Sequence, residues 1–198
     1  MSQLRLGIDL DGVVADFNTG WMERYNRDFR ANLHHSQVVS WDGMVGLTHF
    51  ASMDEFWEWA RQGPASIFRD LPVFAGALET IADLGREHRI VIVSSKFDWA
   101  IPDTLAWLAE HRVAAREIHF VWDKTSVPCD IYLDDGPHNL EALVAARPTA
   151  LICRMVRGWN RPVPGTIDVA DWPEFRRVVT EHAASVEHRP ADAPIHPR

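Results

Sequence analysis

The sequence predicts an α/β fold in which a Rossmann-like parallel sheet carries a small inserted helical cap. Short apolar runs of β type alternate with stretches of helical periodicity, a pattern typical of parallel sheets whose strands are joined by helices. The interval 18–73 breaks this alternation, because it holds several amphipathic helical pieces and no convincing core strand. A chain of 198 residues is long enough for one domain with a subdomain inserted into it.

The predicted strands are short apolar runs that end at polar residues or turns. In chain order they cover 4–9, 89–94, 118–121, 131–134 and 149–153. Helices are predicted between them at 75–87, 102–111 and 137–146. Pro102 falls in the first turn of the second of these helices, where a missing N–H costs no helical hydrogen bond. In the inserted segment, Ser52 and Glu55 have the spacing of a capping box that starts a further helix.

The first predicted strand ends in two carboxylates, Asp9 and Asp11. In a strand this spacing puts both side chains on one face. Gly12 then breaks the strand and helical periodicity follows, so the pair should lie at the carboxyl rim of the sheet, where open α/β sheets bind ligands. Two acids held close together repel, and they need a cation, a shared proton or a basic partner. A Mg²⁺ ion would be a simple solution.

Two more strand ends carry polar groups of the kinds that bind phosphate or metal. The second strand stops at Ser94 and Ser95, and the fourth ends in Asp134 and Asp135. Lys124 lies in the loop that leads to the fourth strand. Parallel strands with like-handed crossovers point their carboxyl ends the same way, so these groups are expected to converge with the first acidic pair.

This order of motifs resembles the haloacid dehalogenase-like phosphatase superfamily, whose motifs are an Asp-x-Asp strand end, a Ser/Thr strand end, a Lys and an acidic pair. Within it, the chain looks most like the 5′(3′)-deoxyribonucleotidases, through Asp-x-Asp-Gly-Val-x-Ala-Asp-Phe at 9–17, the Ser94-Ser95 pair and Asp-Lys-Thr at 123–125. The resemblance covers roughly residues 4–155, and four motifs in order are specific where one is weak. The chain departs from the family in the cap and at 96–98, where Lys-Phe-Asp replaces a Pro-containing turn.

The resemblance implies a haloacid dehalogenase-like core formed by residues 1–17 and 74–184, with residues 18–73 as the cap. It also implies catalytic roles. Asp9 would be the nucleophile that forms an aspartyl-phosphate, and Asp11 the general acid and base. Ser94 would hydrogen-bond a phosphoryl oxygen, while Lys124 would offset the charge shared by that oxygen and the nucleophile.

The metal ligands implied by the resemblance are Asp9, the backbone carbonyl of Asp11, and Asp135, with Asp134 either a ligand or a partner of the ligands. The ion would be Mg²⁺.

The candidates for substrate binding are Phe17, Ser95 and Lys96. Phe17 follows the catalytic turn and matches an aromatic residue of the family's base pocket, so it could stack on a nucleobase. The alternative is that the aromatic residues crowded between 17 and 74 build the core of a small cap. The loop 154–161, which contains Trp159, is interpreted as solvated rather than as a second anion site.

Composition limits the classes of partner. A net charge of −8 and a pI of about 5.6 argue against a nucleic-acid polymer as partner, and no apolar run is long enough to span a membrane. Cys129 and Cys153 lack metal-site spacing, and the chain enters a strand at once, which leaves no room for a signal peptide. We therefore expect a cytoplasmic protein. Residues 185–198 are expected to be a disordered tail. The oligomeric state is left open, a homodimer included.

The favoured interpretation is a Mg²⁺-dependent phosphomonoesterase that acts on a small phosphomonoester, a nucleoside monophosphate. One alternative keeps the chemistry and changes the substrate to a sugar phosphate or another small metabolite. A second alternative is a non-catalytic phosphate- or nucleotide-binding regulator. The complete set of motifs speaks against the regulator, because binding alone has no need of Asp11.

Overall fold

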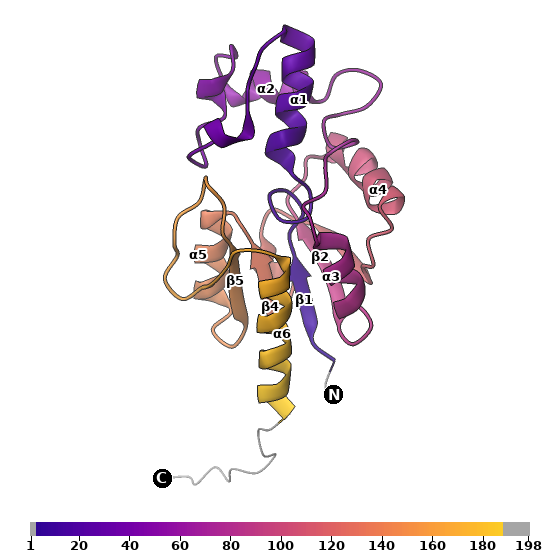
Figure 1. Ribbon diagram of the computed structural model, residues 1–198, viewed down its shortest axis with the longest axis vertical. Helices are drawn as coiled ribbons and strands as arrows, with labels where there is room; N and C mark the ends of the chain where they lie inside the picture. Colours follow the sequence, from indigo (N-terminus) through magenta and orange to yellow (C-terminus); the bar gives the residue numbers. More distant parts are fainter. Residues whose placement is uncertain (1–2, 188–198) are drawn as a thin grey trace.

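The computed structural model describes residues 3–187, in which a parallel sheet is flanked by helices and topped by a helical cap (Figure 1). The sheet order is β3-β2-β1-β4-β5-β6, and all neighbouring strands pair in parallel. The strands are β1 Arg5–Ile8, β2 Arg89–Ser94, β3 Glu117–Phe120, β4 Ile131–Asp134, β5 Leu151–Met155 and β6 Ile167–Val169. The helices are α1 Phe17–Phe29, α2 Met53–Ala60, α3 Ala77–Leu84, α4 Ile101–Glu110, α5 Pro137–Ala146 and α6 Trp172–Glu187.

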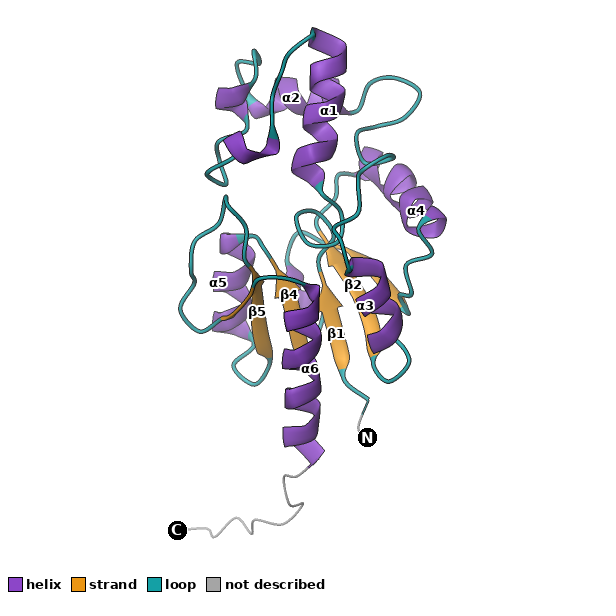
Figure 2. Ribbon diagram, viewed as in Figure 1, coloured by secondary structure: helices purple, strands orange, loops and turns teal. Residues whose placement is uncertain are grey.

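Alternating side chains of the strands build a core on each face of the sheet, as the period of two requires. Ile90 and Ile92 of β2 join the large cluster that includes buried residues of α3, α4 and α6. Val91 and Val93, between them in sequence, pack on the opposite face. On that face α5 also covers β4 and β5 (Figure 2), with Leu140 packed in one cluster with strand residues.

The predicted strands 89–94 and 131–134 and the helix 137–146 have the same bounds in the structure as β2, β4 and α5. The other predicted core elements are present with ends shifted by a few residues. β6 and α6 were not predicted. β6 has only three residues, of which two are exposed, so it carries no alternation that a sequence pattern could reveal.

The end of the chain differs from the expectation. α6 continues to Glu187, so the first residues of the expected tail are helical. The remainder of that tail, 188–198, lies outside the described residues.

The segment after Asp11 is a turn rather than the start of a helix, which corrects the expectation drawn from apolar spacing. Gly12 has a φ of +79°, and the N–H groups of Val14 and Ala15 both donate to Leu10 O at 2.8 Å. These bonds leave the backbone in a tight loop. Helix α1 therefore begins only at Phe17.

The cap joins the core through a narrow neck. The Asp16 N–H donates to Pro72 O at 2.7 Å, and the Phe74 N–H donates to Val14 O at 2.9 Å. Between these bonds Ala15 and Val73 form an isolated antiparallel bridge. Figure 1 shows loop segments connecting the core near the carboxyl end of β1 with the cap, where α1 and α2 lie.

Inside the cap, aromatic residues form the core that the sequence offered as an alternative to ligand stacking. Trp21 and Phe56 are fully buried and meet edge to face with ring centres 5.6 Å apart. Ser52 caps α2 as predicted, by accepting from the Glu55 N–H at 3.3 Å. The reciprocal bond of a capping box is displaced by one residue, since the Glu55 carboxylate accepts from the Ala51 N–H at 2.8 Å. Among the described residues, no helix is both long and apolar enough to cross a membrane.

Candidate active site

The ends of three adjacent strands bring the predicted site residues together. β1 lies between β2 and β4, with Ile8 opposite Ile92 on one side and Leu133 on the other. Asp9 extends β1 by one residue, because its N–H donates to Leu133 O at 3.0 Å. Ser94 and Asp134 are the last residues of their strands. The convergence predicted from strand topology is therefore present.

Lys124 bridges two of the acids. Its Nζ lies 2.9 Å from Asp9 Oδ1 and 2.6 Å from Asp134 Oδ2, and the residue is only 4% exposed. Burial alone would lower the pKa of Lys124, but the charges of Asp134 and Asp9 outweigh it and raise that pKa above its ordinary value. Burial is also the largest effect on Asp9, whose pKa rises to about 6 against the attraction of Lys124. Lys124 is thus a fixed ammonium between two carboxylates.

Asp9, Asp134 and Asp135 form a buried acidic cluster in which one oxygen from each lies within 4.8 Å of the others. Burial raises the pKa of Asp135 well above its ordinary range, and the charges of Asp9 and Asp134 add to this effect. Hard oxygen ligands in such a cluster suit a small divalent cation. The donor set therefore fits a Mg²⁺ site.

Three polar atoms of the site are buried and have no hydrogen-bond partner among the described residues. They are Asp11 Oδ1, Ser94 Oγ and Asp135 Oδ1. Buried polar atoms are normally satisfied, and an orphaned one costs free energy comparable to a lost hydrogen bond. Their concentration at one rim points to a bound group that supplies both positive charge and acceptor oxygens.

Lys96 faces Asp11 rather than open solvent. Its Nζ forms an ion pair with Asp11 Oδ2 and lies 3.8 Å from the centre of the Phe68 ring. The side chain is 1% exposed, and burial lowers the pKa of Lys96. The chain's two lysines, Lys96 and Lys124, are thus both buried at this site.

The other two candidates for substrate binding have partners within the protein. The Ser95 hydroxyl donates to Val121 O at 2.9 Å and braces the ends of β2 and β3. Phe17 is half-buried and its ring stacks on that of Phe68, with the ring centres 5.6 Å apart. The centre of the Trp57 ring lies 6.1 Å from that of Phe17. A contact of either residue with substrate stays a prediction.

The acidic pair leads directly into α5. Pro137 occupies the first turn of this helix. The residue at the N-terminal cap is Gly136, and Asp134 Oδ1, two residues earlier, accepts the Gly136 N–H at 2.8 Å. Asn139 also reaches Asp134 Oδ1, at 3.4 Å. The helix start thereby orients one carboxylate of the cluster.

Sequence analysis missed the loop 156–166 that follows β5. The prediction of a solvated loop at 154–161 is wrong at Trp159, whose indole N–H donates to Asp135 Oδ2 at 2.7 Å. Arg154, which precedes the loop, is 3% exposed and pairs with Asp168 at 2.5 Å. The available signal was the group of Arg, Trp and Asn residues at 154–161, although nothing in their spacing indicates a contact with the acidic pair.

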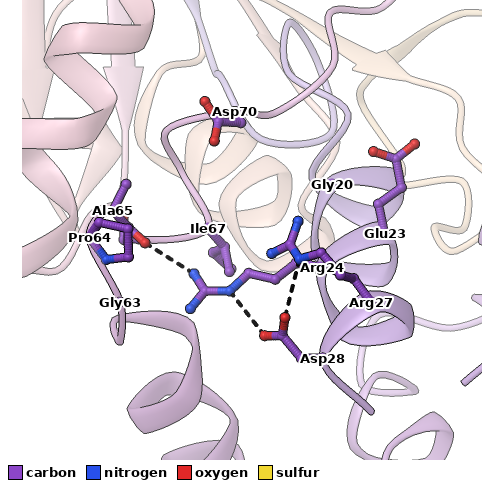
Figure 3. A pocket seen from close by; sticks show the side chains of 11 residues that line it. Gly20, Glu23, Arg24, Arg27, Asp28, Gly63, Pro64, Ala65, Ile67 and Asp70 are labelled. Carbon is purple, nitrogen blue, oxygen red and sulfur yellow. Dashed lines mark hydrogen bonds and ion pairs between the residues drawn. The ribbon is translucent and has the colours of Figure 1, made fainter. Parts of the chain in front are cut away.

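A cavity beside the cap lies away from these residues. It has a volume of about 360 Å³ between α1 and the segment 63–70 (Figure 3). Arg24 crosses it to reach Ala65 O at 3.2 Å and also pairs with Asp28 (Figure 3), so its charge stabilises the cap backbone. The site at the strand ends remains the candidate for chemistry.

The sheet order and the cluster of acids and lysine at the strand ends define a haloacid dehalogenase-like hydrolase. Residues 3–184 match the model of the family described as 5′ nucleotidase, deoxy (pyrimidine), cytosolic type C protein. The chain belongs to this family. It is therefore a nucleotidase, a phosphoric monoester hydrolase, and the non-catalytic regulator is set aside.

Individual relatives agree with this assignment. A candidate 5′(3′)-deoxyribonucleotidase of Chlorobaculum tepidum is 28% identical over 150 residues, which is 70% of this chain and 72% of the relative. The 5′(3′)-deoxyribonucleotidase of Clostridium acetobutylicum is 27% identical over 146 residues, which is 71% of this chain and 78% of the relative. Among solved structures, YfnB of Bacillus subtilis, a candidate haloacid dehalogenase-type hydrolase bound to magnesium, has a TM-score of 0.62 at 13% identity over 90% of this chain and 99% of its own.

Proposed function

We propose that the protein is a Mg²⁺-dependent 5′(3′)-deoxyribonucleotidase that works through an aspartyl-phosphate on Asp9. The observation that carries the proposal is the buried cluster of Asp9, Asp134 and Asp135 with Lys124 bridging the first two. A nucleophilic carboxylate next to a fixed cation and an acidic metal cage is the set of groups that phosphoryl transfer requires.

Asp9, Asp135 and the backbone carbonyl of Asp11 would hold the ion, with Asp134 adjoining it. Asp135 Oδ1 is suited to this, because it is buried and has no partner among the described residues. When bound there, Mg²⁺ would offset the negative charge of the phosphoryl oxygens.

In the first half of the reaction, an oxygen of Asp9 attacks phosphorus and the bond between phosphorus and the sugar oxygen breaks. The Asp11 carboxyl group donates a proton to the departing oxygen. Lys124 and the Ser94 hydroxyl stabilise the charge on the phosphoryl group. Ser94 Oγ is free to do so, since it has no partner in the described structure.

In the second half, water attacks the phosphorus of the aspartyl-phosphate. Asp11 now accepts a proton from that water, and the bond to Asp9 breaks to release inorganic phosphate. The Asp9 carboxylate is restored. Dividing one displacement into two allows a single pair of carboxylates to serve both steps.

All phosphomonoesters present the same phosphate group to the site. Selectivity must therefore come from the residues that contact the leaving group. Phe17, at the start of α1, and the cap residues Trp57 and Phe68 have rings that adjoin one another. Lys96 lies against the last of these rings and against Asp11. An aromatic wall next to the proton donor favours a flat leaving group such as a nucleoside.

A phosphate-release assay tests the proposal. The substrates are 5′ and 3′ deoxyribonucleotides, ribonucleotides and sugar phosphates, each with MgCl₂, with excess EDTA or with CaCl₂. We expect deoxyribonucleotides to give the highest kcat/KM, EDTA to abolish turnover, and Ca²⁺ to inhibit because its larger coordination shell misplaces the nucleophile. Preference for a sugar phosphate would support the alternative substrate class, and full activity in EDTA would exclude the metal site.

A further inference from the structure

The loop 156–166, which follows β5, reaches back to the acidic cluster through one indole. Trp159 Nε1 donates to Asp135 Oδ2 at 2.7 Å. Trp159 is half-buried, whereas Asp135 is 1% exposed. A hydrogen bond to a buried carboxylate is stronger than one between neutral groups and fixes the direction of the acceptor. One oxygen of Asp135 is therefore committed to the loop.

The two oxygens of Asp135 have different surroundings. Oδ2 accepts from Trp159 and is also in close approach to Gly12, where an added Cβ would lie 2.2 Å from it. Oδ1 is buried and has no partner among the described residues. Because Asp135 supplies an oxygen to the cluster with Asp9 and Asp134, Oδ1 is the atom left for a cation.

The loop is held rigidly behind Trp159. The Asn160 side-chain amide donates to Asp135 O at 2.9 Å and to Met155 O at 2.8 Å. Its carbonyl oxygen accepts from Arg154 Nη1 at 2.6 Å. Arg154 is itself fixed by two hydrogen bonds to Asp168, at 2.7 and 2.5 Å. The indole thus stands on a network anchored in β5 and β6.

The same loop holds the turn on the other side of the cluster. Arg157 Nε donates to Gly12 O at 2.6 Å, and its guanidinium lies 3.8 Å from the centre of the Phe74 ring. Gly12 and Asp135 are therefore both tied to one segment of chain that contains none of the family's motifs.

We propose that Trp159 is a positioning residue for the metal site, holding Asp135 in the rotamer that presents Oδ1 to Mg²⁺. The proposal rests on the proposed function, since it assigns a role toward the same ion. Partners of a metal ligand set its orientation, and their loss typically lowers metal affinity about 10–100-fold. Trp159→Phe keeps an aromatic ring and removes the N–H.

The test is calorimetric titration of the metal-free protein with MgCl₂, combined with the Mg²⁺ concentration that half-saturates activity. In Trp159→Phe we expect the dissociation constant for Mg²⁺ and the half-saturating Mg²⁺ concentration each to rise by about tenfold or more. Turnover at saturating Mg²⁺ should recover most of the wild-type rate. The matched control is Trp59→Phe, which also removes an indole donor to a carboxylate, Asp28 Oδ2 at 3.0 Å, but in the cap. It should leave Mg²⁺ affinity unchanged.

A measurement on the wild-type protein covers the case in which Trp159→Phe does not fold. In a ¹⁵N-labelled sample, the indole N–H resonance of Trp159 should shift when Mg²⁺ is added, while that of Trp59 stays in place. Equal Mg²⁺ affinity of wild type and Trp159→Phe, or an unmoved Trp159 resonance in a protein that binds Mg²⁺, would overturn the positioning role alone. A wild-type protein that binds no Mg²⁺ would overturn the proposed function with it.

Discussion

Lys96 and Asp11 form an ion pair at the point where the leaving group of a substrate would depart, and the Phe68 ring closes the lysine from solvent. Lys96 begins the tripeptide 96–98, which stands where the resemblance to the 5′(3′)-deoxyribonucleotidases leads one to expect a Pro-containing turn. The pair places a cation directly on the carboxyl group that is proposed to move the proton. Loss of the lysine would leave Asp11 without this partner and free to turn away.

Lys96→Met is therefore expected to lower kcat on a nucleoside monophosphate by roughly tenfold or more, within the range that general acid–base catalysis contributes. The loss should be much smaller on p-nitrophenyl phosphate, because p-nitrophenolate departs without a proton. Steady-state kinetics on both substrates measure the difference. Lys96→Arg, which keeps the charge, should restore part of the nucleotide rate.

Asp11→Asn supplies the reference for this comparison, since it removes the proton donor itself. If Lys96 acts through Asp11, adding Lys96→Met to Asp11→Asn should cost little more. Equal losses on both substrates together with a raised KM would instead assign Lys96 to a direct contact with the phosphate.

Asp9→Asn should abolish phosphate release, because an amide does not form the covalent intermediate. The fold should survive, since the amide oxygen can still accept from Lys124. Burial raises the pKa of Asp9, so its charge opposes folding at neutral pH. The metal-free variant is thus expected to melt at or above the temperature of the metal-free wild type. Residual turnover near the wild-type rate in a folded sample would exclude the covalent mechanism.

Phe17→Ala tests stacking against packing. If a base stacks on Phe17, kcat/KM should fall more for a nucleotide than for p-nitrophenyl phosphate. The difference corresponds to a loss of about 1–3 kcal/mol of transition-state stabilisation. The comparison between substrates cancels the cost of disturbing the contacts with Phe68 and Trp57. Equal losses on the two substrates would limit Phe17 to packing.

Glu117 gives a prediction for stability that is independent of catalysis. Its carboxylate accepts from Arg5 at 2.6 Å, from Arg89 at 2.6 Å and from His119 at 3.1 Å. The hydrogen bond from Arg5, followed by that from His119, lowers the pKa of Glu117 to about 2. A depressed pKa contributes stability that is fully present above the unfolded value of 4.5 and is lost as pH falls toward 2.

Glu117→Gln should accordingly lower the urea midpoint at pH 7, and the gap from wild type should close between pH 4.5 and pH 2. Glu58→Gln, which breaks one exposed pair with Arg61, is the control and should barely change the midpoint. A gap that persists unchanged at low pH would mean that the effect of Glu117→Gln is not electrostatic.

The strands that carry the site could be predicted because each is a continuous apolar run that stops at a polar residue. β2 and β4 therefore have the predicted bounds, and like-handed connections between parallel strands bring their carboxyl ends to the same edge of the sheet. The pairing of Lys124 with Asp9 and Asp134 is a direct consequence of that topology.

The contacts of Trp159 and Lys96 could not be predicted in the same way. Trp159 meets Asp135 from a loop whose far end leads into β6, a strand of three residues. Lys96 turns toward Asp11 because the Phe68 ring, distant in sequence, covers its other side. Both contacts depend on tertiary placement, which periodicity and spacing do not encode.

The neck between Ala15 and Val73 has an evolutionary consequence. The chain leaves the core and returns to it at adjacent points, so the insertion can change in length or sequence without moving the strands beneath it. The residues proposed for bond breaking therefore lie outside the insertion, whereas Trp57 and Phe68, two of the rings proposed to meet the leaving group, lie within it. A substitution inside the insertion can thus alter the surface offered to the leaving group without displacing the strand ends that hold the acids.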